Sequence, residues 1–192
     1  MTSFETPARD EDVQAHNDRL AREHDIDDYY ARSSLAIRLV ERRRLSVIRR
    51  LVGPAAGLRI LEIGCGGGHV LRLFPRATLV GVDVSAVMLD KARRNLAGLG
   101  AELHHGQIGD LDLADRSFDR IICTEVLEHV IDPELLLSHA RRLLRPGGRA
   151  VITFPNDRLI QPLKDAMVRT GLSRWPPFRR ISWGGDEYHL HV

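Results

Sequence analysis

Apolar and polar positions follow two different rhythms along the chain. Short apolar runs rich in β-branched residues predict strands, and stretches with apolar residues three or four apart predict helices. The predicted strands span 59–65, 78–84, 101–106, 118–125 and 149–155, and the predicted helices between them span 69–74, 85–98 and 132–144. Strands that alternate with helices are typical of βαβ units. The pattern therefore predicts a doubly wound α/β fold with a mostly parallel sheet, covered by helices on both faces.

The predicted elements have matching end residues. Ser85 is a helix N-cap and Gly98 follows the same helix. Asp132 followed by Pro133 begins the next helix, and the RPGG sequence at 145–148 predicts a turn before the last strand.

A further helix precedes the first strand. It is predicted over 27–52, where Leu35 with Leu39, and Leu45 with Ile48, recur at helical spacing, and the GPAAG sequence that follows it ends it. The polar residues before it, up to about position 25, predict a loose arm.

The composition fits one domain without a membrane span. The chain has 192 residues, 43% of them hydrophobic and 28% charged, which is enough for one globular core. No apolar run is long enough to cross a membrane, and the N-terminus lacks the basic start and apolar stretch of a secretory signal. Cys65 and Cys123 lie inside apolar runs, which favours buried, reduced thiols and a cytoplasmic protein.

The net charge of +2 hides an uneven distribution. Residues 1–30 carry nine acids and three basic residues, whereas residues 31–60 carry eight arginines and the single acid Glu41. Such a basic run is more often a solvated helix face than a nucleic-acid site, and few aromatic residues are interleaved with it. Nucleic acid is therefore not the expected partner.

Four glycines lie within five residues of the sequence LEIGCGGGHV, at 61–70. They follow the first predicted strand and precede a helix. In an open parallel sheet, ligands bind beyond the carboxyl ends of the strands. Gly64 and Gly66 can adopt positive φ and leave the backbone accessible, while Gly68 permits close packing of the helix. The sequence therefore predicts a cofactor site here.

Two acids specify the kind of cofactor. Asp83 ends the second predicted strand, where a carboxylate can accept hydrogen bonds from both hydroxyls of a ribose. The alternative is that it only caps the following helix. Glu62 lies two residues before Gly64, where negative charge suits a cationic amino-acid group better than a pyrophosphate.

The sequences LEIGCGGGHVL, GVDVS, SFDRIICTEVLEHVIDP and LRPGGRAVITFPN, in this order, resemble the motifs of class I S-adenosylmethionine-dependent methyltransferases. The resemblance covers about residues 58 to 156. It implies the Rossmann-like fold of that family, S-adenosyl-L-methionine as cofactor, and methyl transfer as the reaction. By this resemblance, Glu62 and the glycines hold the methionine part, Asp83 holds the ribose, and the segment after the third strand frames the adenine.

The resemblance places ten residues at the cofactor. They are Glu62, Gly64, Gly66, Gly68, Asp83, Val84, Met88, Gln107, Ile108 and Thr124. Many relatives have an aspartate where this chain has Gln107, whose amide oxygen can accept the same hydrogen bond from the adenine amino group. Asp110 is the alternative if the loop is shifted, and Gln107 could also be only a polar loop residue.

The segment after the fourth strand supplies candidates for catalysis. Glu125, Glu128 and His129 share one face if the segment is helical. His129 is the best candidate for a general base that deprotonates a hydroxyl acceptor, with Glu125 beside it, or it only shapes the pocket. Similar E-x-x-E-H segments are linked to metal in ubiquinone-biosynthesis O-methyltransferases and small-RNA 3′-end methyltransferases, but we expect no metal here.

We expect three regions: an N-terminal arm and helical lid over 1–52, a cofactor-binding core over 53–156, and a truncated substrate-covering insertion over 157–192. The sheet is then expected to lack the family's C-terminal antiparallel pair. An exposed sheet edge would invite pairing into a homo-oligomer. In the lid, Tyr29 and Tyr30 would lie near the cofactor. The residues of the insertion considered for the acceptor are Arg174, Trp175, Arg179, Arg180 and Trp183.

These expectations combine into one main function and two alternatives. The main expectation is a cytoplasmic enzyme that methylates a small-molecule acceptor, at oxygen, by in-line transfer. The alternatives are a methyltransferase of RNA or another macromolecule, and a cofactor-binding protein without turnover.

Overall fold

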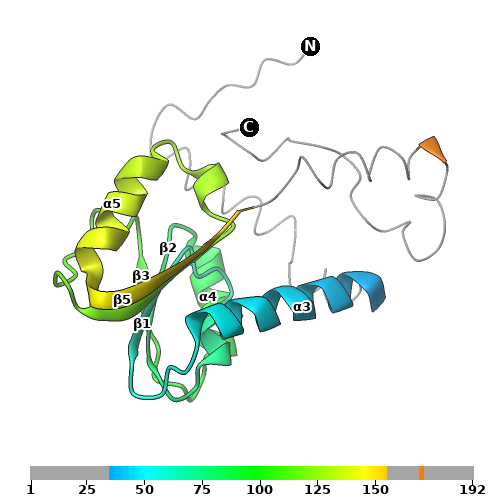
Figure 1. Ribbon diagram of the computed structural model, residues 1–192, viewed down its shortest axis with the longest axis horizontal. Helices are drawn as coiled ribbons and strands as arrows, with labels where there is room; N and C mark the ends of the chain where they lie inside the picture. Colours follow the sequence, from blue (N-terminus) through cyan, green and yellow to red (C-terminus); the bar gives the residue numbers. More distant parts are fainter. Residues whose placement is uncertain (1–34, 155–168, 171–192) are drawn as a thin grey trace, which may run out of the picture.

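The computed structural model describes residues 35–154 and 169–170 of the chain. A sheet of five parallel strands has the order β3-β2-β1-β4-β5 (Figure 1). The strands are β1 (Arg59–Ile63), β2 (Thr78–Asp83), β3 (Glu102–His105), β4 (Phe118–Thr124) and β5 (Leu144–Thr153). The helices are α3 (Leu35–Val52), α4 (Ala86–Asn95) and α5 (Pro133–Leu143), with the 3-10 helices η1 (Leu71–Leu73) and η2 (Leu127–His129). The predicted Rossmann-like fold is confirmed.

Helices cover both faces of the sheet, as the alternating pattern predicts. One core packs α3 and α4 on the sheet, through Ile48 and Leu89 among others. The other core packs α5 on the opposite face, through Leu136 and Leu143. Successive residues of a strand point to opposite faces, so that Ile60 enters the first core and Leu61 the second.

The end of α3 is fixed to the sheet by two arginines. Arg120 donates from Nε to the carbonyl of Val52 at 3.0 Å, and Arg149 donates from Nη1 to the carbonyl of Leu51 at 2.8 Å. Both carbonyls belong to the last turn of α3, where no further helical turn satisfies them. The helix therefore ends at the predicted place and is held against β4 and β5. The predicted start of this helix at 27 lies outside the described residues.

Several predicted element ends need correction. The helix predicted over 85–98 ends at Asn95, because the chain leaves the helix at Leu96, before Gly98. The segment 69–74 forms only the 3-10 helix η1. The predicted turn at 145–148 lies within β5, where the pairing jumps from Phe118–Leu144 to Arg120–Arg149 and the additional residues form a bulge.

Two further predictions, the Ser85 helix cap and the buried free cysteines, are confirmed. The Ser85 hydroxyl caps α4 by accepting from the backbone N–H of Met88, and both cysteines are buried free thiols. Burial raises the pKa of the Cys123 thiol to about 12. No helix among the described residues is long and apolar enough to cross a membrane. Residues 1–34 lie outside the described residues, as do nearly all of 155–192, and with them the predictions about the arm, the insertion and an antiparallel pair.

Candidate cofactor site

The predicted site residues gather at one edge of the sheet. Glu62 lies next to the last residue of β1, Asp83 ends β2, and Thr124 ends β4. Because all strands are parallel, their carboxyl ends lie at the same edge. The glycine loop at 64–68 follows β1 directly and lies between β1 and η1.

Two positions of this loop require glycine, because side chains of other segments lie close to the backbone there. Gly64 has φ +69°, and a Cβ atom there would lie 2.4 Å from Cγ2 of Val126, in the loop after β4. Gly68 has φ +78°, and a Cβ there would lie 2.8 Å from Cδ1 of Leu96, at the end of α4. Any side chain at either position would meet both strain and a clash. The loop is therefore packed tightly between α4 and the end of β4.

Asp83 joins the glycine loop to the start of α4. Its Oδ2 accepts from the backbone N–H of Gly66 at 2.7 Å, and its Oδ1 accepts from that of Ser85 at 2.8 Å. The carboxylate thus has the structural role at the helix start that was the alternative interpretation, and it also orders the loop. A carboxylate can accept about four hydrogen bonds, so these two contacts are compatible with the binding of ribose hydroxyls.

Glu62 is an almost fully buried acid, with 2% of its surface exposed. Its Oε2 has no hydrogen-bond partner among the described residues. Burial raises the pKa of this carboxyl well above its usual value, against the lowering effects of the Leu71 backbone N–H and the Arg44 charge. A buried oxygen without a partner costs stability. The cationic amino-acid end of S-adenosylmethionine would provide the missing partner, so the site fits this cofactor.

Replacing Glu62 with glutamine is expected to flatten the pH dependence of folding in the ligand-free protein. A carboxyl whose pKa is raised on folding binds its proton more tightly in the folded chain. The wild type therefore loses stability as pH rises from the unfolded-state pKa of about 4.3 towards the higher folded-state pKa. Glu62→Gln should lack this loss and gain stability relative to wild type, as urea unfolding at about pH 4 and about pH 8 would show.

The exposed acid Glu134 provides the control for this experiment. Glu134→Gln should leave the pH dependence of the wild type nearly unchanged, since no such burial surrounds this side chain. Parallel free-energy curves for Glu62→Gln and wild type would contradict the account of Glu62.

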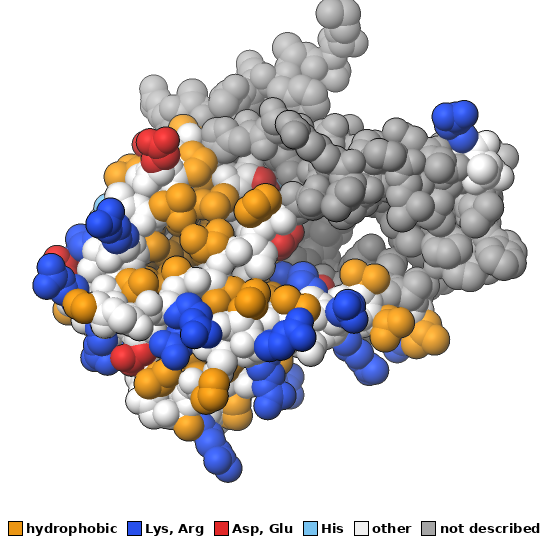
Figure 2. All heavy atoms as spheres, viewed as in Figure 1, with side chains coloured by type: hydrophobic (Ala, Val, Ile, Leu, Met, Phe, Trp, Pro, Cys, Tyr) orange, Lys and Arg blue, Asp and Glu red, His pale blue; other side chains and the backbone are white. Residues whose placement is uncertain are grey.

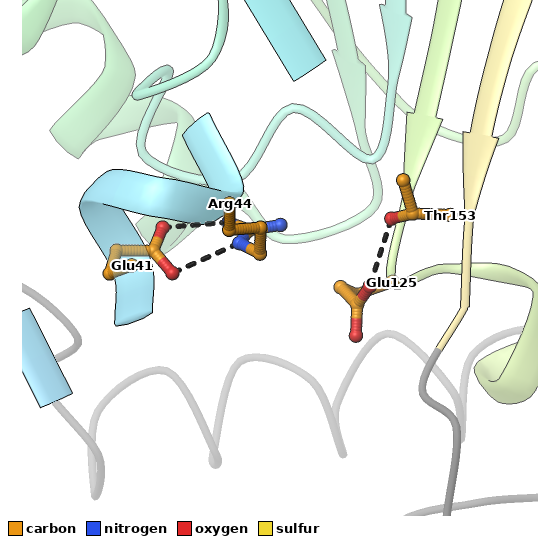
Figure 3. Close-up of polar contacts among 4 residues, drawn as sticks. All are labelled: Glu41, Arg44, Glu125 and Thr153. Atoms are coloured by element: carbon orange, nitrogen blue, oxygen red, sulfur yellow. Dashed lines mark hydrogen bonds and ion pairs between the residues drawn. The ribbon is translucent and has the colours of Figure 1, made fainter. Parts of the chain in front are cut away.

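Glu125 occupies an unusual backbone position at the end of β4. Its φ is +56°, in the left-handed region that costs non-glycine residues about 1–3 kcal/mol. Two contacts to Thr153 at the end of β5 hold it there. The Glu125 N–H donates to the Thr153 carbonyl at 3.1 Å, and the Thr153 hydroxyl donates to Oε1 of Glu125 at 2.8 Å (Figure 3).

The predicted helical face of Glu125, Glu128 and His129 does not form. The segment is the short 3-10 helix η2, and Glu125 lies before it in the left-handed conformation, so the three side chains do not share one helical face. Glu128 is buried, and its Oε1 lies 4.0 Å from Nε2 of the half-exposed His129. Within 35–154 and 169–170, no three acidic, histidine or cysteine side chains are placed to hold a metal ion.

The remaining predicted residues surround the edge of the site. Met88 reaches the glycine loop, since its Cε would lie 3.3 Å from a Cβ on Gly66. Val84 is half-buried beside Asp83, and Thr124 and Ile108 are buried. Gln107 is exposed, as is the alternative Asp110, whose N–H donates to the Gln107 carbonyl at 3.1 Å.

Two neighbours of the site were not predicted as site residues. Arg44 on α3 pairs with Glu41 through two hydrogen bonds of 2.9 Å (Figure 3). The charge of Arg44 also acts on Glu62. The only hint in the sequence is the run of basic residues, which does not single out one arginine. Thr153 has no local signal, because its role depends on the pairing of β5 with β4.

Comparison with known proteins agrees with this geometry. Residues 61–152 match the family described as methyltransferase domain. The chain is 41% identical over 137 residues to a ubiquinone biosynthesis O-methyltransferase of Dinoroseobacter shibae, covering 68% of this chain and 54% of that protein. It is 36% identical over 118 residues to one of Alkalilimnicola ehrlichii, covering 59% and 48%. The chain thus spans about half the length of these relatives.

Solved structures show the same fold. A SAM-dependent methyltransferase from Thermotoga maritima aligns with a TM-score of 0.62 at 24% identity, covering 80% of this chain and 70% of that one. An S-adenosylmethionine-dependent methyltransferase from Mesorhizobium loti aligns with a TM-score of 0.51 at 29% identity, covering 57% and 52%. The motifs, the fold and the match over 61–152 together identify this part of the chain as a domain of the class I S-adenosylmethionine-dependent methyltransferase family.

Proposed function

We propose that the protein transfers the methyl group of S-adenosylmethionine to a hydroxyl oxygen of a small-molecule acceptor. The observation that carries this proposal is the joining of Asp83 and Gly66 next to the buried acid Glu62, at the carboxyl edge of the sheet. The choice of oxygen draws support from the O-methyltransferase relatives.

Each part of the cofactor has a matching group. Glu62 would bind the ammonium of the methionine part, and Asp83 would accept hydrogen bonds from the ribose hydroxyls. The backbone of Gly64, Gly66 and Gly68 would lie against the cofactor, with Thr124 at the end of the neighbouring strand. The amide of Gln107 would accept from the adenine amino group. Val84, Met88 and Ile108 would supply the apolar contacts.

The cofactor itself supplies a methyl group already activated by the positive sulfur. The protein then has to align the acceptor, exclude water and remove a proton. His129 is the last residue of η2, which follows β4, and it is half-exposed, so that its imidazole can accept the proton of an acceptor hydroxyl. Glu128 beside it would stabilise the imidazolium that forms.

Regions at the edge of the core would complete the site. α3 packs against β5 and places Arg44 near Glu62, which supports the proposal that residues 1–52 form a lid over the cofactor-binding core of 53–156. We assign cover of the acceptor to residues 157–192.

Replacing Thr153 with valine is expected to lower turnover about tenfold with little change in cofactor affinity. Valine keeps the shape of threonine but removes the hydroxyl that donates to Glu125. A hydrogen bond to a charged group contributes about 1.5–3 kcal/mol. We expect part of this at the exposed Glu125. Steady-state kinetics should show the loss in kcat, and Thr153→Ser, which keeps the hydroxyl, should restore it. Equal kinetics for Thr153→Val and wild type would show that the hydrogen bond from the Thr153 hydroxyl to Glu125 does not contribute to turnover.

The proposed reaction can be tested by mass spectrometry. The full chain is incubated with S-adenosylmethionine and pools of phenolic and other hydroxyl compounds, and products are searched for a gain of one methyl group. We expect such a product from a hydroxyl compound. Cofactor binding without any methylated product would favour a cofactor-binding protein without turnover, and methylation of RNA alone would favour the macromolecular alternative.

A further inference from the structure

α3 has an outer face that the cofactor site does not use. Ile48 and Val52 on its inner side are buried in the core, and Arg44 is half-buried towards Glu62. The outer face consists of the exposed residues Leu35, Arg38, Leu39, Arg42, Arg43, Ser46, Arg49 and Arg50. α3 can therefore pack on the core through its inner side while its outer face contacts a partner.

No acid of the described residues pairs with the arginines of this outer face. Glu41 is the only acid of α3, and it is occupied by Arg44. The five arginines of the outer face make no ion pair with any residue of the described part. They therefore present a stripe of positive charge along the helix, which attracts an anionic partner.

Exposed leucines accompany these arginines. Leu35 is 74% exposed and Leu39, one turn later on the same side, is 67% exposed. Figure 2 shows blue arginine side chains along α3 and orange hydrophobic side chains towards its N-terminal end. A large apolar side chain exposed to water does not contribute the favourable free energy of burial. This pair therefore favours an apolar contact within the same surface.

The surface is hollowed beside the arginines. One hollow of about 410 Å³ is lined by Leu39, Arg42, Arg43, Ser46, Val47 and Arg50. A second, of about 630 Å³, adjoins it through Ser46 and Arg50 and adds Arg49 and Arg76. Its floor includes residues that precede β1 and β2, at the end of the sheet opposite to Asp83. These hollows are therefore separate from the candidate cofactor site.

We propose that the outer face of α3 docks on an anionic phospholipid surface. Arginines bind the headgroup phosphates, and Leu35 and Leu39 enter the boundary between headgroups and acyl chains, as in helices that lie in a membrane interface. A nucleic acid fits less well, because the outer face contains no aromatic side chain on which a base could stack. The leucines would then also remain in water.

Sedimentation with lipid vesicles tests this proposal on the full chain. We expect binding to vesicles of equal phosphatidylglycerol and phosphatidylcholine, weaker binding as salt is raised, and little binding to phosphatidylcholine alone. Arg42→Gln with Arg43→Gln should weaken binding about 25-fold, at about fivefold for each arginine near an anionic membrane. Leu35→Ser with Leu39→Ser should weaken it about tenfold at the same net charge.

A matched control removes the same charge elsewhere. Arg94→Gln with Arg141→Gln changes exposed arginines of α4 and α5, outside the hollows, and should leave vesicle binding within about threefold of wild type. Equal losses in this control and in the Arg42 and Arg43 variant would overturn the proposal, since net charge alone would explain them. So would a lack of vesicle binding, or single-stranded RNA binding that depends on the arginines but not on the leucines. Thermal unfolding of each variant confirms that the chain still folds.

Discussion

Asp83→Ala is expected to weaken the binding of S-adenosylmethionine and of its demethylated product about 10- to 150-fold. This corresponds to about 1.5–3 kcal/mol, the usual contribution of hydrogen bonds to a charged group. Asp83 accepts from Gly66 at 2.7 Å and from Ser85 at 2.8 Å, so its loss also frees the glycine loop against which the cofactor would lie. The effect should therefore lie in the upper part of this range. Calorimetric titration measures it directly.

A second aspartate provides the control. Asp90 is exposed on α4, and its carboxylate pairs with Arg93 at 2.5 Å. Asp90→Ala should bind the cofactor like wild type, because a surface ion pair contributes little. If both variants bind like wild type, Asp83 has no part in the site. If Asp83→Ala unfolds, its role in fixing the loop is larger than its role towards the ligand, and Asp83→Asn, which keeps one acceptor oxygen, gives the measurable intermediate.

His129→Ala is expected to reduce turnover on a hydroxyl acceptor by roughly 10²–10⁴, the range of general acid–base catalysis. Cofactor affinity should change little, since we assign cofactor binding to Asp83 and Glu62. The loss should shrink for an acceptor that is already ionised, because no proton then needs to be removed. His139→Ala on α5 is the matched histidine control and should retain most of the activity.

A metal-dependent reaction would give a different result. Excess chelator would then abolish wild-type activity, and Glu125→Ala and Glu128→Ala would resemble His129→Ala. We expect full activity in chelator, since η2 and the left-handed Glu125 hold these three side chains apart from one helical face. A fully active His129→Ala protein would remove the proposed base.

The fold was predictable because short-range sequence patterns indicate its strands and helix starts. The apolar runs that become β1, β2 and β4 are short, β-branched and bounded by glycine or polar residues. Ser85 and the Asp132–Pro133 pair mark helix starts by hydrogen bonds within one turn of the chain. The bulge in β5 was not predictable in this way, since RPGG is a turn sequence wherever it occurs and only the pairing with β4 keeps it in the sheet.

The candidate site was predictable where it depends on the chain's own neighbours. The positive φ of Gly64 and the position of Asp83 follow from the end of one strand and the end of the next. The helical face of Glu125 and His129 did not form, because Glu125 is bound to Thr153, 28 residues later. The approach of Arg44 to Glu62 likewise depends on how α3 packs on the sheet. No periodicity within the sequence encodes such contacts.

The central claim is that the carboxyl edge of β1 and β2 binds S-adenosylmethionine. Calorimetric titration of the full chain with S-adenosylmethionine, with its demethylated product and with NAD tests it most directly. We predict that each chain binds one molecule of S-adenosylmethionine or of its demethylated product, with saturation. We predict no saturable binding of NAD, because its anionic pyrophosphate would have no favourable charge interaction with Glu62. Saturable binding of NAD alone, or of none of the three, would contradict the account.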